Sequence, residues 1–281
     1  MIKLFCTDLD GTLFYLPDSE MAGITEENML AMQKLKDHHI HLMTATGRHH
    51  TFLPRVLNDT SLHFDTVGFC GAEVFFDNQV LFAMAFEPNE LTALARHLES
   101  TSLEAGLHFT TLENDWVHHN VNSPMFQRFR SIPKNGLPKD CRTLFEINIY
   151  EYLSVQRTSP IIRVSFWFPD FNDLESYRKL LLAAFPNQYT IVQSSPRELQ
   201  LMKDGMHKGK GIAMVAEKMN IGIDEIAVIG DSDNDIGMFE YVPCSFCMSH
   251  AAPELQAKAK YTVDSFAQSV EMVIEMNERE N

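Results

Sequence analysis

The sequence is poor in positive charge. Its 281 residues include 23 Lys and Arg against 38 Asp and Glu, which gives a formal net charge of −15. Proteins that bind a nucleic-acid backbone concentrate Lys and Arg on their surface, so this balance argues against a nucleic-acid partner. The excess of carboxylates also repels small anions, and an anionic substrate would therefore need a local positive site.

Long apolar runs are absent as well. No stretch of about 18 consecutive apolar residues occurs, so no membrane-spanning helix and no membrane partner are expected. The N-terminal MIKLFCTDLDG reaches acidic residues too early for a secretory signal peptide. We therefore expect a cytoplasmic protein.

Cysteine is scarce and scattered. The five cysteines lie in apolar segments and do not resemble the even, regularly spaced set of a disulfide framework. Cys244 and Cys247 form a single CxxC pair, which without a second pair is a weak zinc signal. Buried strand cysteines are the favoured interpretation of this pair.

The remaining composition is that of an ordinary globular protein, with 45% hydrophobic and 22% charged residues. Residues 2–6 form a short apolar run that predicts a buried strand. Thr25, followed by two glutamates, predicts a helix start, with Met29, Met32 and Leu35 on one face. Residues 41–43 predict the next strand. The order strand, helix, strand indicates a parallel sheet.

The middle of the chain has a different pattern. Residues 74–76 and 80–82, separated by Asp77 and Asn78, predict a hairpin. Beyond it, helical and strand-like segments alternate without polar loops of catalytic type. The expected helices contain Leu91, Leu94 and Leu98, and later Leu174, Tyr177 and Leu181; the expected strands are 144–150, 161–168 and 189–192, and 131–138 is expected to be a loop.

The parallel-sheet pattern resumes near the C-terminus. A helix is expected around Ile212, Val215 and Met219, strands at 226–229 and 246–248, and a closing helix around Val270, Val273 and Met276. We therefore expect an α/β fold with a doubly wound parallel sheet and an inserted α+β domain. The expected boundaries are residues 1–83 for the first part of the core, 84–196 for the insertion and 197–281 for the second part of the core.

Three polar loops follow three of the predicted parallel strands: DLDGT at 8–12, TATGR at 44–48 and GDSDND at 230–235. In an open α/β sheet, loops beyond the carboxyl ends of the strands converge on one crevice. So many carboxylates at short range are costly unless a cation neutralises them. Hard oxygen ligands of this kind suit Mg²⁺.

These motifs, in this order, resemble the haloacid-dehalogenase superfamily of phosphohydrolases. DLDGT is similar to the family's DxDGT, ATGR to its second motif, Lys208-Gly209 to its third, and GDSDND to its GDxxND. The long insertion between the second and third motifs resembles the type IIB cap of the Cof-like branch. The resemblance implies a Rossmann-like core and a cap that closes over the site.

The resemblance also implies roles for individual residues. Asp8 would attack phosphorus and form an aspartyl-phosphate, and Asp10 would act as acid and then base. Alternation along an extended strand end places both on the same side. The metal ligands would be Asp8, Asp10, Asp231 and, through water, Asp235; the residues that bind phosphate would be Leu9, Thr46, Gly47, Lys208 and Asn234.

Plainer interpretations exist for each residue. Asp8 and Asp10 alone could belong to a surface turn. Lys208 alone could be a solvated lysine, with Lys203 and Lys210 nearby, and Arg48 is interpreted as a structural charge partner. The KGKG segment does not satisfy the GxxxxGK[ST] pattern of a P-loop.

Some positions depart from the family pattern or have an open role. Cys70 and His250 stand where this branch commonly has asparagine, and the C-terminal Asn-x-x-Gly-Val stretch is missing. These departures do not remove the nucleophile or the metal ligands. In the insertion, Trp116 and the histidines could face a substrate or belong to the core or surface; the histidines are His108, His118 and His119.

The sequence thus predicts a magnesium-dependent phosphatase acting on a small phosphate monoester. Sugar phosphates are the first substrate class, and phosphorylated cofactors such as pyridoxal phosphate or a flavin nucleotide come next. A phosphotransferase or mutase with the same intermediate is one alternative, and a non-catalytic sensor of a phosphorylated metabolite is another. The oligomeric state is left open.

Overall fold

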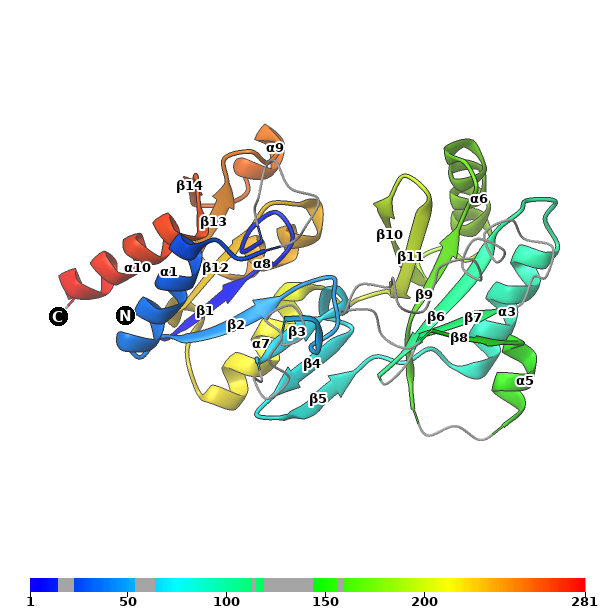
Figure 1. Ribbon diagram of the computed structural model, residues 1–281, viewed down its shortest axis with the longest axis horizontal. Helices are drawn as coiled ribbons and strands as arrows, with labels where there is room; N and C mark the ends of the chain where they lie inside the picture. The colour runs from blue at the N-terminus through cyan, green and yellow to red at the C-terminus, as the bar shows by residue number, and fades with distance from the viewer. Residues whose placement is uncertain (15–22, 54–63, 113–114, 119–143, 156–158, 281) are drawn as a thin grey trace. The chain divides into compact units, whose positions relative to one another are not determined.

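The computed structural model describes residues 1–14, 23–53, 64–112, 115–118, 144–155 and 159–280 (Figure 1). The chain forms two compact units, one from Met1–Phe82 and Met206–Asn281 and the other from Ala83–Gly205. Among the described residues, no helix combines the length and the apolar character that crossing a membrane requires.

The first unit is built on an eight-stranded sheet. The strands β14, β13, β12, β1, β2 and β3 are paired in parallel, and β4 joins β3 antiparallel. In spatial order the strands are β14 (Tyr261–Val263), β13 (Cys244–Met248), β12 (Ile226–Gly230), β1 (Leu4–Thr7), β2 (His41–Ala45), β3 (Thr66–Gly68), β4 (Glu73–Phe76) and β5 (Gln79–Ala83). The doubly wound parallel sheet expected from the sequence is confirmed.

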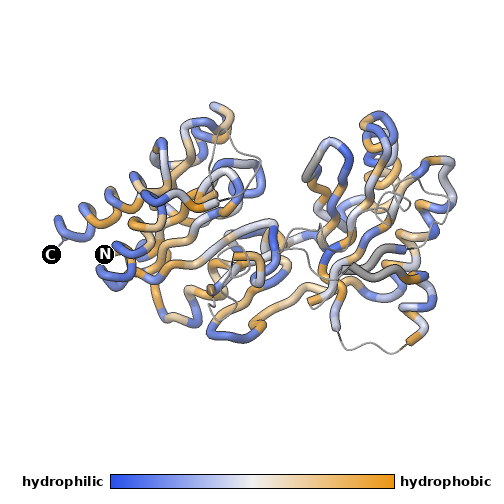
Figure 2. Tube along the Cα trace, in the orientation of Figure 1, coloured by the Kyte–Doolittle hydropathy of each residue, from blue (hydrophilic) through white to orange (hydrophobic). Residues whose placement is uncertain are grey.

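Helices cover both faces of this sheet because its central strands are apolar on both sides. Phe5 of β1 packs in one core with α1 (Glu26–Asp37) and α10 (Phe266–Glu280). Leu4 and Cys6, which point to the opposite face, pack with α7 (Lys208–Met219) and α8 (Ile236–Tyr241). The short helix α9 (Pro253–Gln256) precedes β14. Figure 2 shows the hydrophobic colour along these central strands.

Helix α1 begins where the sequence predicts, but its buried face differs. The Thr25 hydroxyl accepts a hydrogen bond from the backbone N–H of Asn28 at 3.1 Å, which caps the helix. Leu35 is buried as expected, whereas Met29 is 49% exposed. Asn28 lies inside instead, because its side chain donates to the Leu13 carbonyl. The expectation that Met29 faces the core is therefore wrong.

The hairpin of β4 and β5 has the turn that its sequence indicates. Asp77 and Asn78 both have positive φ angles, 52° and 59°. Two consecutive left-handed residues make the tight turn whose twist matches the flanking strands. This hairpin closes one edge of the eight-stranded sheet.

The second unit contains a six-stranded sheet with its own core. In spatial order its strands are β10 (Tyr189–Ser195), β11 (Glu198–Lys203), β9 (Ile161–Trp167), β6 (Gly106–Thr111), β7 (Asp115–His118) and β8 (Leu144–Ile147). All pairs are antiparallel except β7 with β8. The buried faces of α3 (Pro88–Glu99), α5 (Ile149–Ser154) and α6 (Phe171–Ala184) join the apolar side of this sheet.

Two expectations about this region are corrected. The strand expected over 144–150 ends at Ile147, because Asn148 caps α5 by accepting from the backbone N–H of Tyr150 at 2.9 Å. Residues 198–203 form β11, which pairs with β10 and β9. The second unit therefore continues to Gly205, whereas we expected the core to resume at residue 197. The expected loop at 131–138 lies outside the described residues.

The CxxC pair lies in a strand, as the plainer interpretation predicts. Cys244 and Cys247 are both in β13, and both are free thiols. Cys247 is buried in the sheet core. Neither belongs to a group of potential metal ligands among the described residues.

Candidate functional site

The three polar loops come from neighbouring strands of the first unit. Asp8 follows β1, Thr46 follows β2, and Asp231 follows β12, and these strands lie side by side in the sheet (Figure 1). The backbone N–H of Asp8 donates to the Ile229 carbonyl at 2.9 Å, which continues the pairing of β1 with β12 to the start of the loop. The predicted convergence at the carboxyl ends therefore rests on adjacent parallel strands.

Lys208 connects two of these loops. Its ammonium Nζ donates to Oδ1 of Asp8 and to Oδ1 of Asp235, each at 2.6 Å. Lys208 and Asp235 have no exposed side-chain surface, and Asp8 is also buried. Such short, water-excluded contacts are the strong kind of charge-assisted hydrogen bond. The interpretation of Lys208 as a solvated lysine is therefore wrong.

Asp235 shapes the loop after β12 as well as holding Lys208. Its Oδ2 accepts from the backbone N–H groups of Asp231 and Ser232 at 2.9 and 3.0 Å. These contacts close the turn that leads into the short 3₁₀ helix Asp233–Asp235. Both carboxylate oxygens of Asp235 thus have protein partners. Its contact with a cation through water stays a prediction.

Asp231 lies against the first loop and the loop after β13. The Thr12 hydroxyl donates to its Oδ1 at 3.2 Å, and Nε2 of His250 lies 3.4 Å from its Oδ2. Gly11, with φ +86°, leaves room for this carboxylate, since a Cβ at Gly11 would lie 2.2 Å from Oδ2. The glycine of the first motif is therefore required by a close approach.

Two acids of this cluster, Asp8 and Asp231, have raised pKa values. Burial raises the pKa of Asp8 well above its usual value despite the Lys208 ammonium, and the Asp235 carboxylate adds to the effect. Burial and Asp235 also raise the pKa of Asp231. The pKa of Lys208 is raised because the attraction of Asp235 and Asp8 outweighs its burial, so it stays protonated.

The donor set fits a divalent cation. Asp8, Asp231 and Asp235 each offer a carboxylate oxygen, and these atoms lie within 4.8 Å of one another. Three carboxylates and one ammonium carry a formal charge of −2 when all are ionised, which one divalent ion balances. All the donors are hard oxygens, the ligands that Mg²⁺ prefers.

Asp10 points to a different partner. Its carboxylate accepts two hydrogen bonds from Arg48, from Nε at 2.6 Å and from a terminal nitrogen at 2.8 Å. The Arg48 guanidinium also lies over the Phe52 ring, 3.9 Å from its centroid. Arg48 is thus the charge partner that the sequence suggested. Both side chains of the pair are about half exposed, so opening it costs roughly 1 kcal/mol.

The loop after β2 presents a hydroxyl and a tight backbone. Thr46 is buried, and its hydroxyl accepts from the Arg48 N–H at 3.1 Å while its carbonyl accepts from the Cys70 N–H at 3.0 Å. Cys70 has φ 55°, a left-handed conformation that asparagine adopts more readily than most residues. A Cβ at Gly47 would meet the Cys70 sulfur at 3.6 Å, an ordinary contact, so packing in this structure does not require glycine there.

Two predicted phosphate-binding residues differ in what they can offer. The Leu9 side chain belongs to the core against α10, so only its backbone is available to a substrate. Asn234 accepts from the Ser232 hydroxyl at 3.2 Å through Oδ1. The structure therefore gathers Asp8, Asp231, Asp235 and Lys208 by direct contact or proximity, whereas it pairs Asp10 with Arg48.

Two residues of the cluster were not among the predicted site residues. Thr12 and His250 both approach the Asp231 carboxylate. Thr12 stands in the DLDGT motif, and its hydroxyl was the available signal. His250 was noticed as a departure from the family pattern, but nothing in the sequence placed it beside Asp231.

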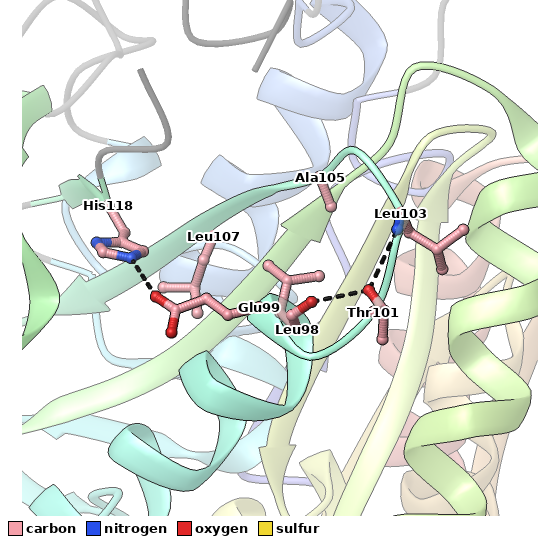
Figure 3. Close-up of a pocket in the computed structure, with 7 residues that line it drawn as sticks. All are labelled: Leu98, Glu99, Thr101, Leu103, Ala105, Leu107 and His118. Atoms are coloured by element: carbon pink, nitrogen blue, oxygen red, sulfur yellow. Dashed lines mark hydrogen bonds and ion pairs between the residues drawn. The ribbon is translucent and has the colours of Figure 1, made fainter. Parts of the chain in front are cut away.

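The second unit has a small pocket between α3 and its sheet (Figure 3). Its volume is about 270 Å³, and it is lined by Leu98, Glu99, Thr101, Leu103, Ala105, Leu107 and His118. The charged group in this lining is the Glu99 carboxylate, which would repel a phosphate. His118 lies 3.4 Å from Glu99, and its Nδ1 accepts from the Ile149 N–H at 3.1 Å. His118 therefore has a structural role at the start of α5.

Of the remaining candidates of the insertion, His108 lies on β6. The side chain of Trp116 and the whole of His119 lie outside the described part of the chain.

The sheet and the acid cluster at its carboxyl edge define a doubly wound α/β core with a carboxylate-rich site. The chain belongs to the haloacid dehalogenase-like hydrolase family, whose model matches residues 5–273. The family membership expected from the motifs is thus confirmed.

The relatives and the solved structures agree with this membership. A Streptococcus pyogenes protein named as a candidate phosphatase is 28% identical, with 94% of this chain and 93% of that protein covered. The 5-amino-6-(5-phospho-D-ribitylamino)uracil phosphatase of Escherichia coli is 24% identical, with 94% and 91% covered. The structure of a subclass IIB sugar phosphatase superposes with a TM-score of 0.75 at 20% identity, covering 96% of this chain and 98% of that one.

Proposed function

We propose that this protein is a magnesium-dependent phosphatase that hydrolyses a small phosphate monoester through an aspartyl-phosphate on Asp8. The observation that carries the proposal is the buried contact of Lys208 with Asp8 and Asp235 beside the Asp231 carboxylate. A carboxylate held this way is oriented as a nucleophile, and the ammonium beside it can neutralise the phosphoryl group.

The first half of the reaction would use Asp8 and Asp10. An Oδ atom of Asp8 forms a bond to phosphorus while the bond from phosphorus to the ester oxygen breaks. The leaving oxygen takes a proton from Asp10, which must first leave its ion pair with Arg48 and take up a proton from solvent. Because that pair is half exposed and weak, substrate binding can supply the cost of opening it.

The second half reverses the role of Asp10. Its carboxylate takes a proton from a water molecule, the water oxygen bonds to phosphorus, and the bond from phosphorus to Asp8 breaks to release inorganic phosphate.

Two sets of groups would bind the phosphate and the metal. The phosphoryl oxygens would be bound by the Thr46 hydroxyl, the Gly47 and Leu9 N–H groups, Asn234 and Lys208. Mg²⁺, which supplies charge neutralisation when bound, would be held by Asp8, Asp231, the Asp10 backbone carbonyl and, through water, Asp235.

The proposed substrate class is inferred from the names of related proteins. The E. coli relative is named for a phosphorylated ribitylaminouracil, and a structural neighbour is named a sugar phosphatase. We therefore place sugar phosphates first and phosphorylated cofactors second. The second unit, which comprises residues 83–205, would act as the cap. The cytoplasmic location of the protein stays a prediction.

A phosphate-release screen tests the proposed activity. Wild-type protein is incubated with Mg²⁺ and a panel of phosphorylated metabolites without any added acceptor alcohol. We expect release of inorganic phosphate that stops on chelation and falls at least about 1000-fold in Asp8→Asn. Undiminished hydrolysis by Asp8→Asn would contradict the nucleophile, and transfer that requires an acceptor would indicate a phosphotransferase.

A further inference from the structure

A second group of potential metal ligands lies at the other end of the ATGR loop. His49 and His50 directly follow this loop, and Glu73 is the first residue of β4. One atom from each side chain falls within 4.8 Å of the others. Nε2 of His49 lies 3.3 Å and Nδ1 of His50 lies 2.8 Å from the same oxygen, Oε1 of Glu73. The proposed roles of the acid cluster do not use any of these residues.

From this geometry we propose that His49, His50 and Glu73 form a second metal site, which binds a borderline divalent ion of the zinc type. Two imidazole nitrogens and one carboxylate suit Zn²⁺ or Co²⁺, whereas Mg²⁺ prefers an all-oxygen set. The chain would then hold two different divalent ions. The acid cluster selects one of them and the histidine cluster selects the other.

The distances are close to those that a tetrahedral ion needs. With bonds of about 2.0–2.1 Å, neighbouring ligand atoms lie roughly 3.3–3.4 Å apart. The separation of His49 Nε2 from Glu73 Oε1 already has this value. His50 Nδ1 lies at a hydrogen-bonding distance from Glu73 Oε1. An ion would therefore replace the shared proton and move these two atoms apart by about half an ångström. That proton would pass to the other nitrogen of the same ring, and both imidazoles would bind in the neutral form.

The Glu73 carboxylate is fully buried and fixed in position. Its Oε2 lies 3.4 Å from the backbone nitrogen of His50, which donates to it. Gly68 leaves the space that the carboxylate occupies, because a Cβ there would lie 2.7 Å from Oε2 of Glu73. The carboxylate is thus held between β3 and the loop after β2.

Both imidazoles are oriented by groups outside the cluster. Nδ1 of His49 lies 2.9 Å from the Thr51 hydroxyl and accepts from the Thr51 N–H at 3.3 Å, and Nε2 is directed to Glu73. With an ion on Nε2, Nδ1 would carry the proton and donate it to the Thr51 hydroxyl in place of the longer contact. The His50 ring stacks on Phe75, with 4.0 Å between centroids and 2° between planes. Metal-binding histidines usually have such a partner on the second nitrogen, and an apolar surround limits water. The side chain of His50 is 18% exposed, which gives an ion a route to the cluster.

An ion at this position would tie the loop after β2 to the β3–β4 edge. Arg48, which precedes His49, holds Asp10, and Thr46 is a proposed phosphate-binding residue. An ion held by His49 and His50 would therefore stabilise the end of this loop. This ion is bound independently of substrate and of Mg²⁺.

Cobalt titration of the full-length protein tests this proposal. Chelator-treated protein is saturated with Mg²⁺ and then titrated with Co²⁺, whose visible bands report nitrogen ligands at low coordination number. We expect one Co²⁺ per chain, displaced by Zn²⁺. Affinity should fall at least 100-fold in His50→Gln and be unchanged in His41→Gln, a matched histidine paired with Asp65 at 2.8 Å. Asp231→Asn, which disrupts the acid cluster, should keep the Co²⁺ site.

A measurement on the wild-type protein removes dependence on the variants. In ¹⁵N NMR spectra of the histidine rings, Zn²⁺ should shift the signals of His49 and His50 and leave that of His41 in place. Absence of Co²⁺ uptake beyond the acid cluster, wild-type affinity in His50→Gln, or Zn²⁺-independent signals of His49 and His50 would each overturn the proposal.

Discussion

Lys208 is completely buried between two carboxylates, so its ammonium neutralises charge that water cannot reach. In a buried ion pair, desolvation offsets much of the attraction, and the pair adds little stability compared with an apolar replacement of the same shape. Removal of one partner is different, because the remaining charges are left without compensation. Both Asp8 and Asp235 depend on this one side chain.

Replacement of this lysine should therefore damage both stability and activity. In Lys208→Met, we expect the free energy of unfolding at pH 7 in chelator to fall by about 3–5 kcal/mol, measured by urea denaturation. Turnover should fall at least about 100-fold in Mg²⁺. Lys218→Met, an exposed change on the same helix, should match wild type in both assays. Wild-type behaviour of Lys208→Met would show that the contact is unimportant.

The sequence predicted the members of the acid cluster better than their partners. Asp8, Asp231 and Asp235 could be placed together because each follows a predicted parallel strand. The pairing of Asp10 with Arg48 and the approach of His250 to Asp231 depend on side-chain rotamers and on segments distant in sequence. A motif identifies residue types and their order, but it does not determine which way a carboxylate turns.

Among the elements, α7 and α8 come unusually close. A Cβ on Gly209 would lie 2.1 Å from the Gly237 carbonyl oxygen and 3.1 Å from Cβ of Tyr241. The third motif thus combines a lysine that reaches the acids with a glycine that lets its helix approach α8. The lysine position depends on the helix contact.

A methyl group at this contact should separate the two helices. Gly209→Ala is expected to lower the free energy of unfolding by about 1–3 kcal/mol, because the clash is with backbone that cannot turn away. Turnover should fall as well, since Lys208 is the preceding residue. Lys218→Ala on the exposed face should change stability by less than about 0.5 kcal/mol. Thermal unfolding and phosphate release measure both effects, and an unaffected Gly209→Ala would contradict the close contact.

Element prediction succeeded where local signals were strong. The Thr25 cap, the Asp77-Asn78 turn and the apolar spacing of α3 and α6 all agree with the structure. It failed at Asn148, whose capping role was hidden within an apolar run, and at β11, which was not predicted and lies beyond the expected end of the insertion. A local capping bond decided the outcome at Asn148, whereas the antiparallel pairing with β9 and β10 decided it at β11.

At the scale of the whole molecule, the chain divides into two units because each unit has its own hydrophobic core. The second unit has its own apolar cluster, in which Phe109, Phe166 and Tyr177 are fully buried. Its boundary at Gly205 follows from the pairing of β11 with β9. No change in amino-acid composition marks this boundary in the sequence. The size of the insertion could be predicted from motif spacing, but its end could not be fixed to within a strand.

A separate core predicts independent folding. Residues 83–205 expressed alone should give a cooperative thermal transition by circular dichroism, because every strand of the six-stranded sheet lies within this range. Phe166→Ala in the same fragment should lower stability by about 3–5 kcal/mol or abolish the transition. A fragment without any cooperative transition would contradict the separate core.

The central claim is that Asp8 carries the phosphoryl group during turnover. Its most direct test is chemical trapping in Asp10→Asn, in which loss of the acid and base should slow hydrolysis of the intermediate. A reaction with a substrate from the screen is quenched in acid and reduced with borohydride, which converts an aspartyl-phosphate to homoserine. The account predicts homoserine at position 8 by peptide mass spectrometry, absent in Asp8→Asn. Phosphate release with an unmodified Asp8, or trapping at another residue, would contradict it.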